Sequence, residues 1–205
     1  MLFSFWNFQS LVIVFFSGNI FTFVTVPKVC KLAALDSEDI VILMASYRKM
    51  YPSSALDISH MGEIVKKYGY VTIWVKIFGS KLIHGKLKSS DILVCWDTKD
   101  LNHPTFHLLP CRVDFYFSHT ALIERKSITN IFAKVSWYKE YSDRYKYGSA
   151  LQMFLSNRFE VQGYNCFIPV QKIHSRFSKG MSGKDLMCVC PIPRRVLIDN
   201  DQWCI

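Results

Sequence analysis

Charged residues are absent from the first 26 positions of this 205-residue chain, and acidic residues are scarce along all of it. The chain holds 16 Asp and Glu against 25 Lys and Arg, which gives a formal net charge of +9. Paired carboxylates for general acid–base catalysis are therefore not evident. The surplus of positive charge favours polyanionic partners such as nucleic acid or anionic lipid.

Motifs of known reactions are missing as well. The nine glycines form no phosphate loop of the GxGxxG or GxxxxGKS type, and neither a GxSxG elbow nor an HExxH motif occurs. His103 and His107 are spaced like a helical metal pair, but Pro104 opposes a helix there. A thiol nucleophile at Cys111, with His107 or His119 as its base, is the least favoured alternative. We expect no enzymatic activity, no cofactor and no small-molecule substrate.

The seven cysteines are odd in number and irregular in spacing, unlike a secreted disulfide scaffold. No Cys-x-x-Cys pair is present, and zinc sites usually need such pairs. Cys188 and Cys190 would lie on one face of a strand, where we expect small buried residues. The sequence predicts no metal site.

Residues 1–26 form an apolar N-terminal segment that is long enough to cross a bilayer. Lys28 and Lys31 follow at once, as on a cytoplasmic flank. A signal peptide would normally open with a basic residue, and the Phe, Val, Ile and Thr content favours strands. Three interpretations stay open: a signal or membrane anchor, a strand, or an extension outside the domain.

Residues 27–68 are expected to be a helical lead-in. A first helix is predicted over 36–50, capped by Asp36 or Ser37 and blocked by Pro52. A second, shorter helix is predicted over 57–67, ending at Gly69. Both are interpreted as packing against the residues that follow.

Residues 69–198 are expected to be a β-rich domain, followed by a tail over 199–205. Strands are predicted over 70–78, 91–96, 111–119, 130–138, 166–174 and 186–190, with a loop over 97–110 and a strand or helical turn over 150–156. Val113, Phe115 and Phe117 align on one face by alternation, as do Ile131, Ala133, Val135 and Trp137. The fold class is mainly β, an antiparallel, partly open barrel or sandwich with one or two N-terminal helices.

Aromatic and basic residues alternate in the segment from Trp137 to Tyr147. Such a segment can stack on bases and pair with phosphates, or form an aromatic cage around a methylated lysine. A second basic group follows the predicted core residues Phe167, Val170 and Ile173. The candidate binding surface comprises Trp137, Tyr138, Lys139, Tyr141, Arg144, Tyr145, Lys146, Tyr147, Lys172, His174 and Arg176.

Four stretches keep a recognisable order: IFGSKLIHGKLKSSDILVCW, NIFAKVSWYKEYSDRYKYGSALQMF, CFIPVQKIHSRF and LMCVCPIPRR. Over residues 75–195 this order resembles a domain of uncharacterised, often transposon-linked proteins. That pattern is in turn loosely similar to the bromo-adjacent homology (BAH) domain, a β-rich chromatin-interaction module. Ala150, Leu151 and Phe154 stand where the transposon-linked pattern has a proline-containing segment ending in Trp. The resemblance implies no particular ligand-binding residue.

Taken together, these features predict a non-enzymatic interaction module of mobile-element type that binds chromatin or nucleic acid. The resemblance favours the nucleus. The alternative is a membrane-anchored or secreted protein that residues 1–26 target, with membrane contact through that segment.

Overall fold

The protein is described here by a computed structural model, which defines residues 4–7, 10–17, 20–27, 31–52, 56–57, 62–82, 90–96, 107–146, 151–163 and 165–192. In chain order the elements are β1 (Ser4–Asn7), β2 (Ser10–Ser17), β3 (Ile20–Pro27), β4 (Lys31–Ala34), α1 (Ser37–Met50), β5 (Leu56–Asp57), β6 (Ile64–Tyr68), β7 (Tyr70–Ile73), β8 (Lys76–Gly79), β9 (Asp91–Trp96), β10 (His107–Ile123), β11 (Lys126–Glu140), β12 (Gln152–Phe159), β13 (Phe167–Pro169), the 3₁₀ turn η2 (Val170–Lys172), β14 (Ile173–Met181) and β15 (Leu186–Pro191).

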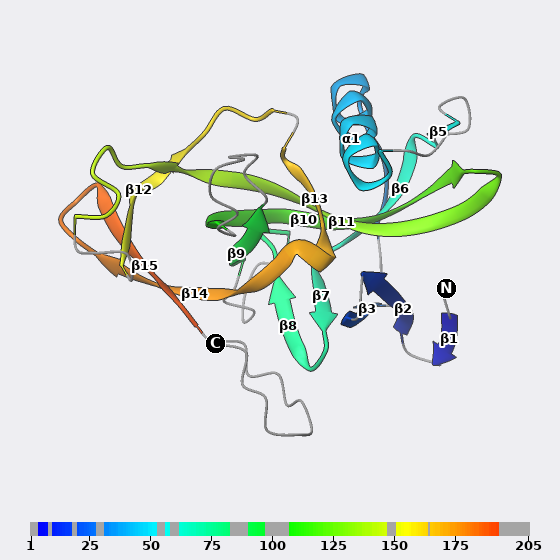
Figure 1. Ribbon diagram of the computed structural model, residues 1–205, viewed down its shortest axis with the longest axis horizontal. Coiled ribbons are helices and arrows are strands. Elements are labelled where there is room, and N and C mark those ends of the chain that lie inside the picture. The colour runs from blue at the N-terminus through cyan, green and yellow to red at the C-terminus, as the bar shows by residue number, and fades with distance from the viewer. Residues whose placement is uncertain are drawn as a thin grey trace.

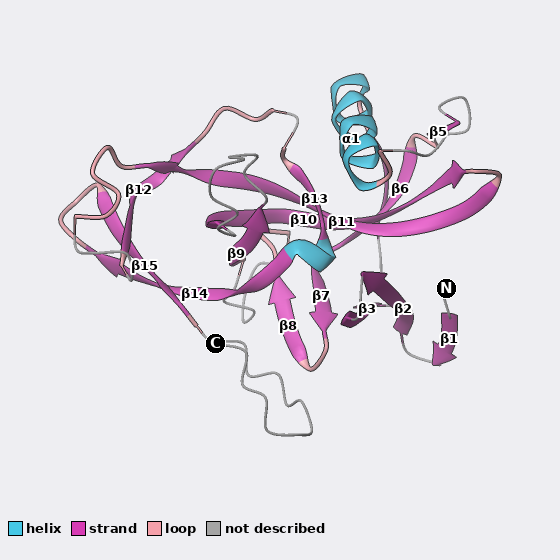
Figure 2. Ribbon diagram, viewed as in Figure 1, coloured by secondary structure: helices cyan, strands magenta, loops and turns pink. Residues whose placement is uncertain are grey.

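The strands pair antiparallel in two sheets (Figures 1 and 2). The smaller sheet has the order β1-β2-β3-β7-β8. The larger one has the order β13-β11-β12-β15-β14-β9-β10-β6-β4, with β5 beside β10. An additional pairing of β10 with β11 closes part of this sheet into a ring. The predicted mainly-β, antiparallel fold is therefore confirmed.

The main core lies where the two sheets meet. Val24 of β3, Val71 of β7 and Phe78 of β8 are fully buried in the same cluster as residues of β9, β10 and β11. Burial of this apolar surface is the main stabilising contribution to the fold. Phe167, Val170 and Ile173, which the sequence predicts in the core, are all buried.

The helix predicted over 36–50 is α1, and it packs on the turn-side half of the long β10–β11 hairpin, whose turn extends past the helix (Figure 1). The carboxylate of Asp36 caps it by accepting a hydrogen bond of 2.7 Å from the backbone N–H of Asp39. Tyr47 is fully buried there with Phe117 and Phe132 in a second core cluster. This packing holds the turn-side half of the hairpin, its turn end, against the helix.

The second predicted helix is wrong. Leu56–Asp57 and Ile64–Tyr68 are strands, and β6 lies between β4 and β10 in the large sheet. Val65 and Tyr68 are buried, whereas Lys66 between them is exposed. Pairing with strands far along the chain has overridden the local helical pattern.

Two loop and strand boundaries also differ from the predictions. Residues 70–78 form the hairpin β7–β8 rather than one strand, because Trp74 adopts a φ of 56° and turns the chain. The backbone N–H of Trp74 donates to the carbonyl of Phe23, and the two rings meet edge to face. The predicted loop over 97–110 ends earlier than expected, since β10 begins at His107 and Pro110 pairs with Leu93.

A β-bulge interrupts β10 at Asp114. Val113 packs in the main core, but Phe115 and Phe117 pack in the α1 cluster. The expectation that all three share one face is therefore wrong, because the extra residue of a bulge reverses the alternation. On β11 the alternation holds: Ile131, Ala133 and Val135 lie in the main core and Trp137 packs against it.

Residues 4–7, 10–17 and 20–27 of the apolar N-terminal segment form β1, β2 and β3. β3 pairs with β7, and this joins the segment to the small sheet. Within the described residues the structure contains no helix with the length and apolar character needed to cross a membrane.

Candidate functional site

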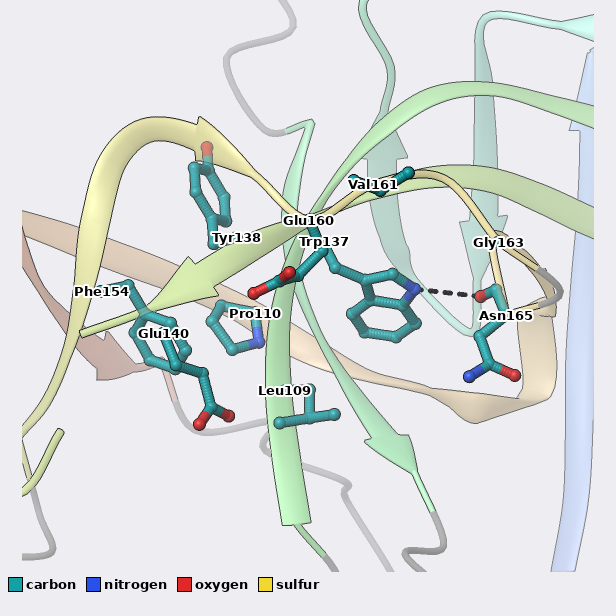
Figure 3. A pocket seen from close by; sticks show the side chains of 10 residues that line it. All are labelled: Leu109, Pro110, Trp137, Tyr138, Glu140, Phe154, Glu160, Val161, Gly163 and Asn165. Atoms are coloured by element: carbon teal, nitrogen blue, oxygen red, sulfur yellow. Dashed lines mark hydrogen bonds between the residues drawn. The ribbon is translucent and has the colours of Figure 1, made fainter. Parts of the chain in front are cut away.

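A hollow of about 290 Å³ opens beside the last residues of β11 (Figure 3). Its lining residues are Leu109, Pro110, Trp137, Tyr138, Glu140, Phe154, Glu160, Val161, Gly163 and Asn165. We call it the Trp137 hollow, because the half-buried Trp137 indole forms its largest aromatic wall. The indole N–H donates a hydrogen bond of 3.0 Å to the carbonyl of Asn165, which fixes the plane of the ring.

Two carboxylates contribute to this lining, and no Lys, Arg or His does. Glu160 follows β12, and its backbone N–H donates a hydrogen bond of 2.9 Å to the carbonyl of Trp137. This bond holds Glu160 beside the indole ring. In Figure 3 the carboxyl groups of Glu140 and Glu160 lie on the same side of the indole, opposite Asn165. An aromatic face next to carboxylates attracts cations. The local charge is thus opposite in sign to the net charge of +9.

Tyr138 contributes to the lining, but its hydroxyl is used inside the protein. It donates a hydrogen bond of 2.6 Å to the carboxylate of Asp91 and accepts one of 2.6 Å from the Lys179 ammonium. Lys179 also forms an ion pair of 2.8 Å with Asp91. Burial, and then the neighbouring Asp91, raises the pKa of Tyr138 well above its usual range, so the phenol stays protonated.

Arg144 has a structural role rather than a free guanidinium. It forms an ion pair of 2.5 Å with Glu140, and its Nε and Nη2 donate to the amide oxygen of Gln152. Its guanidinium also lies 5.0 Å from the centroid of the Phe154 ring. These contacts tie the β11–β12 connection to β12 and partly neutralise Glu140.

The other predicted surface residues fall into two groups. Near the end of β11, Lys139 is exposed. On the β11–β12 connection, Tyr145 and Lys146 are exposed and Tyr141 is half-buried, while Tyr147 lies outside the described residues. On η2 and β14, His174 is exposed, and Lys172 and Arg176 are half-buried.

The structure does not bring these two groups into one patch. Gln152 of β12 pairs with Val189 of β15, and Val189 pairs with Lys179 of β14. Arg144 of the β11–β12 connection bonds to Gln152, so along the strand direction the connection lies at the height of Lys179. His174 is five residues further along β14, about 16 Å at the rise of a strand.

The thiol alternative gains no support from the geometry. Cys111 is fully buried, and burial raises the pKa of its thiol well above the usual value. His119 is engaged elsewhere, with Tyr47 and the carbonyl of Gly62. Cys190 is exposed and Cys188 half-buried, so the expectation of two buried cysteines there is wrong. The described residues contain no group of three or more His, Cys, Asp and Glu arranged to hold a metal ion.

Several lining residues carry no signal in the sequence. Glu160 and Asn165 lie 23 and 28 positions after Trp137 and reach it through β12 and the approach to β13. Leu109 and Pro110 come from the neighbouring strand β10. Acidic residues are few in the sequence and suggest no carboxylate pair, although Glu140 does follow the predicted aromatic strand and ends β11.

No family model matches this chain, and neither the curated proteins nor the solved structures contain a match.

Proposed function

We propose that this protein is a non-catalytic binding module whose Trp137 hollow receives a cationic side chain from a protein partner. The observation that supports this is the placing of the Trp137 indole beside Glu140 and Glu160, with no cation in the lining. A lysine side chain, and above all its methylated form, offers an apolar stem and a diffuse positive charge. Both complement an aromatic wall bordered by carboxylates.

The hollow has room for one side chain. Its volume of about 290 Å³ is at the lower end of the range of roughly 300–1,000 Å³ for ligand pockets. Leu109 and Pro110 supply apolar surface for a methylene stem, and Val161, 94% exposed, stands at its edge. A flexible tail that crosses this edge can insert one residue.

The partner that we propose is a basic tail of a chromatin protein. The antiparallel β architecture is compatible with a BAH-like interaction module, and the order of motifs over residues 75–195 supports the same class. A tail rich in lysine would meet the acidic hollow in spite of the net charge of the whole chain, because exposed charges act mainly within a Debye length of about 8–10 Å.

Peptide titration tests this proposal. Fluorescence anisotropy would compare one labelled lysine-rich peptide in unmodified, monomethylated and trimethylated form, and the same peptide with glutamine at that position. We expect the trimethylated peptide to bind most tightly and the glutamine peptide to lose roughly tenfold or more in affinity, about 1.4 kcal/mol. Equal affinity for all four peptides would contradict the proposal.

Matched tryptophan variants locate the site. Trp137→Ala should abolish the preference for the methylated peptide, and Glu160→Gln should weaken binding of every cationic peptide several-fold. Trp74→Ala serves as the control, because Trp74 is also partly exposed but lies on the β7–β8 turn, away from the lining residues. Circular dichroism on each variant would verify that the fold is retained.

A further inference from the structure

A second hollow, of about 470 Å³, lies where β12 meets the β14–β15 turn. Its lining residues are Tyr141, Leu155, Arg158, Ser182, Gly183, Lys184, Asp185 and Leu186. We call it the Tyr141 hollow. It shares no lining residue with the Trp137 hollow. The Trp137 hollow is bordered by β10 and β11, whereas the Tyr141 hollow is bordered by β12, β15 and the β14–β15 turn.

The floor of the Tyr141 hollow is apolar. Leu155 of β12 stands directly opposite Leu186 of β15, so the two half-buried side chains share one face of the sheet. Tyr141 forms an aromatic wall, and its backbone N–H donates to the carbonyl of Met153. A planar ring that enters this space meets two leucines and a tyrosine, which is the kind of surface on which a nucleobase stacks.

The rim of the hollow is cationic. Arg158 and Lys184 are exposed, and within the described part of the chain neither forms an ion pair. Asp185 is the one acidic residue of the lining, against the two basic residues Arg158 and Lys184. Its backbone carbonyl accepts a hydrogen bond from the N–H of Ser156. The local charge is therefore positive, opposite to that of the Trp137 hollow.

The β14–β15 turn adds backbone donors to the same rim. Gly183 has a φ of +82°, a conformation that glycine adopts without strain. The N–H of Ser182 donates to the carbonyl of Leu186 and closes the turn. Among the described residues, the amides of Gly183 and Lys184 donate no backbone hydrogen bond. Successive free amides in such a turn form a concavity that suits an anion.

We propose that the Tyr141 hollow binds one nucleotide unit of single-stranded nucleic acid. The base stacks on Tyr141 over the leucine floor, and its phosphate is held by Arg158, Lys184 and the turn amides. Lys139 near the end of β11 is exposed, so it can contact a neighbouring phosphate. A duplex keeps its bases stacked inside and offers none to the hollow. This proposal does not rest on the function proposed for the Trp137 hollow.

Fluorescence anisotropy on the full chain tests the proposal, with a labelled oligothymidylate of about 15 residues and a duplex of equal length. We expect the single strand to bind more tightly than the duplex. Arg158→Glu/Lys184→Glu should weaken single-strand binding at least roughly tenfold and reduce the magnitude of the slope of log K against log salt by ~0.7, the value for one phosphate contact. Tyr141→Ala should weaken it roughly tenfold through lost stacking.

The matched control is Arg125→Glu/Lys126→Glu at the β10–β11 turn, which makes the same change in net charge at two exposed residues far along the hairpin. It should lower affinity less than threefold, and Trp137→Ala should leave single-strand binding unchanged. Thermal unfolding of all variants would show that each is folded. Equal losses in the site and control variants, a duplex bound as tightly as the single strand, or no binding of the native protein at low salt would each overturn the proposal.

Discussion

The two ends of the β10–β11 hairpin differ in what covers them. At the turn end, α1 lies on the hairpin, and Tyr47, Phe117 and Phe132 are fully buried. At the open end, the half-buried Trp137 and Tyr141 each line a hollow. The same pair of strands therefore carries a packed cluster under α1 at one end and borders two hollows at the other.

This division implies that stability and binding can be changed separately. A substitution under α1 should alter the free energy of unfolding without altering the affinity of the remaining folded protein for its ligands. A substitution near either hollow should do the reverse. The following changes test that separation, from the largest expected effect to the smallest.

Phe132→Ala should cause the largest loss. The ring is fully buried, with its centroid 5.3 Å from that of Tyr47 and 5.4 Å from that of Phe117. Truncation of a buried phenylalanine costs about 3–5 kcal/mol. Urea denaturation monitored by circular dichroism measures this loss of unfolding free energy. The control is Tyr145→Ala, because the Tyr145 side chain is 48% exposed. A loss below about 1 kcal/mol would show that the turn end is loosely packed.

Removal of Lys134 should have the next largest effect. Its ammonium forms an ion pair of 2.8 Å with Asp39, and their side chains are only 17% and 11% exposed. Lys134→Met leaves a largely buried carboxylate without its cation, which we expect to cost about 1–3 kcal/mol. The double variant Asp39→Asn/Lys134→Met should lose less than Lys134→Met alone.

The exposed counterpart is Lys81, whose side chain is 44% exposed in its ion pair with Asp114. Lys81→Met should cost less than about 1 kcal/mol, because water screens an exposed pair. Urea denaturation of the single and double variants of Lys134 and Asp39 measures the coupling energy of the buried pair, and the loss in Lys81→Met is compared with it. Equal losses for Lys81→Met and Lys134→Met would contradict the view that the helix end depends on a buried pair.

How far the sequence predicts this fold depends on how local the determining contacts are. The predicted strand over 91–96 is β9, and Asp36 caps α1 as its position before the helix suggested. These features depend on alternation and on neighbours within four residues. β6 depends instead on partners in β4 and β10, and the bulge at Asp114 on pairing with β11, so neither could be predicted locally.

The candidate site shows the same limit. Trp137 lies on the wall of a hollow, which its place in an aromatic strand end suggested. The sequence predicts that Tyr138 and Arg144 face a ligand, but the Tyr138 hydroxyl bonds to Asp91 and the Arg144 guanidinium bonds to Glu140 and Gln152. Residue type indicates what a side chain can bind, whereas only the fold decides whether an internal partner already binds it.

Acid should weaken the turn end through His119. Its Nε2–H donates to the carbonyl of Gly62, so its Nδ1 accepts from the Tyr47 hydroxyl at 2.9 Å. Burial lowers the pKa of His119 below its usual 6.5. The unfolded chain therefore binds a proton at this histidine more readily than the folded protein does. The contribution of neutral His119 to the free energy of unfolding is present above pH 6.5 and is lost as the pH falls below it.

Thermal unfolding at pH 7.5 and at pH 5.5 measures this dependence. The native protein and His174→Gln, which changes an exposed histidine, should both show a lower Tm at pH 5.5. His119→Gln should lower the Tm at pH 7.5 and flatten the difference between the two pH values. An unchanged pH difference in His119→Gln would place the titrating group elsewhere.

The smallest expected effect comes from Arg144→Met, and it tests the open end directly. Arg144 neutralises Glu140, and this carboxylate lines the Trp137 hollow. Its removal should make the hollow more acidic and tighten binding of a cationic peptide about 1.5- to 5-fold, the range of an exposed charge pair. Arg158→Met removes the same charge from the other hollow and should leave peptide affinity unchanged. Weaker peptide binding by Arg144→Met would mean instead that the guanidinium contacts the ligand, and the two hollows would then act as one surface.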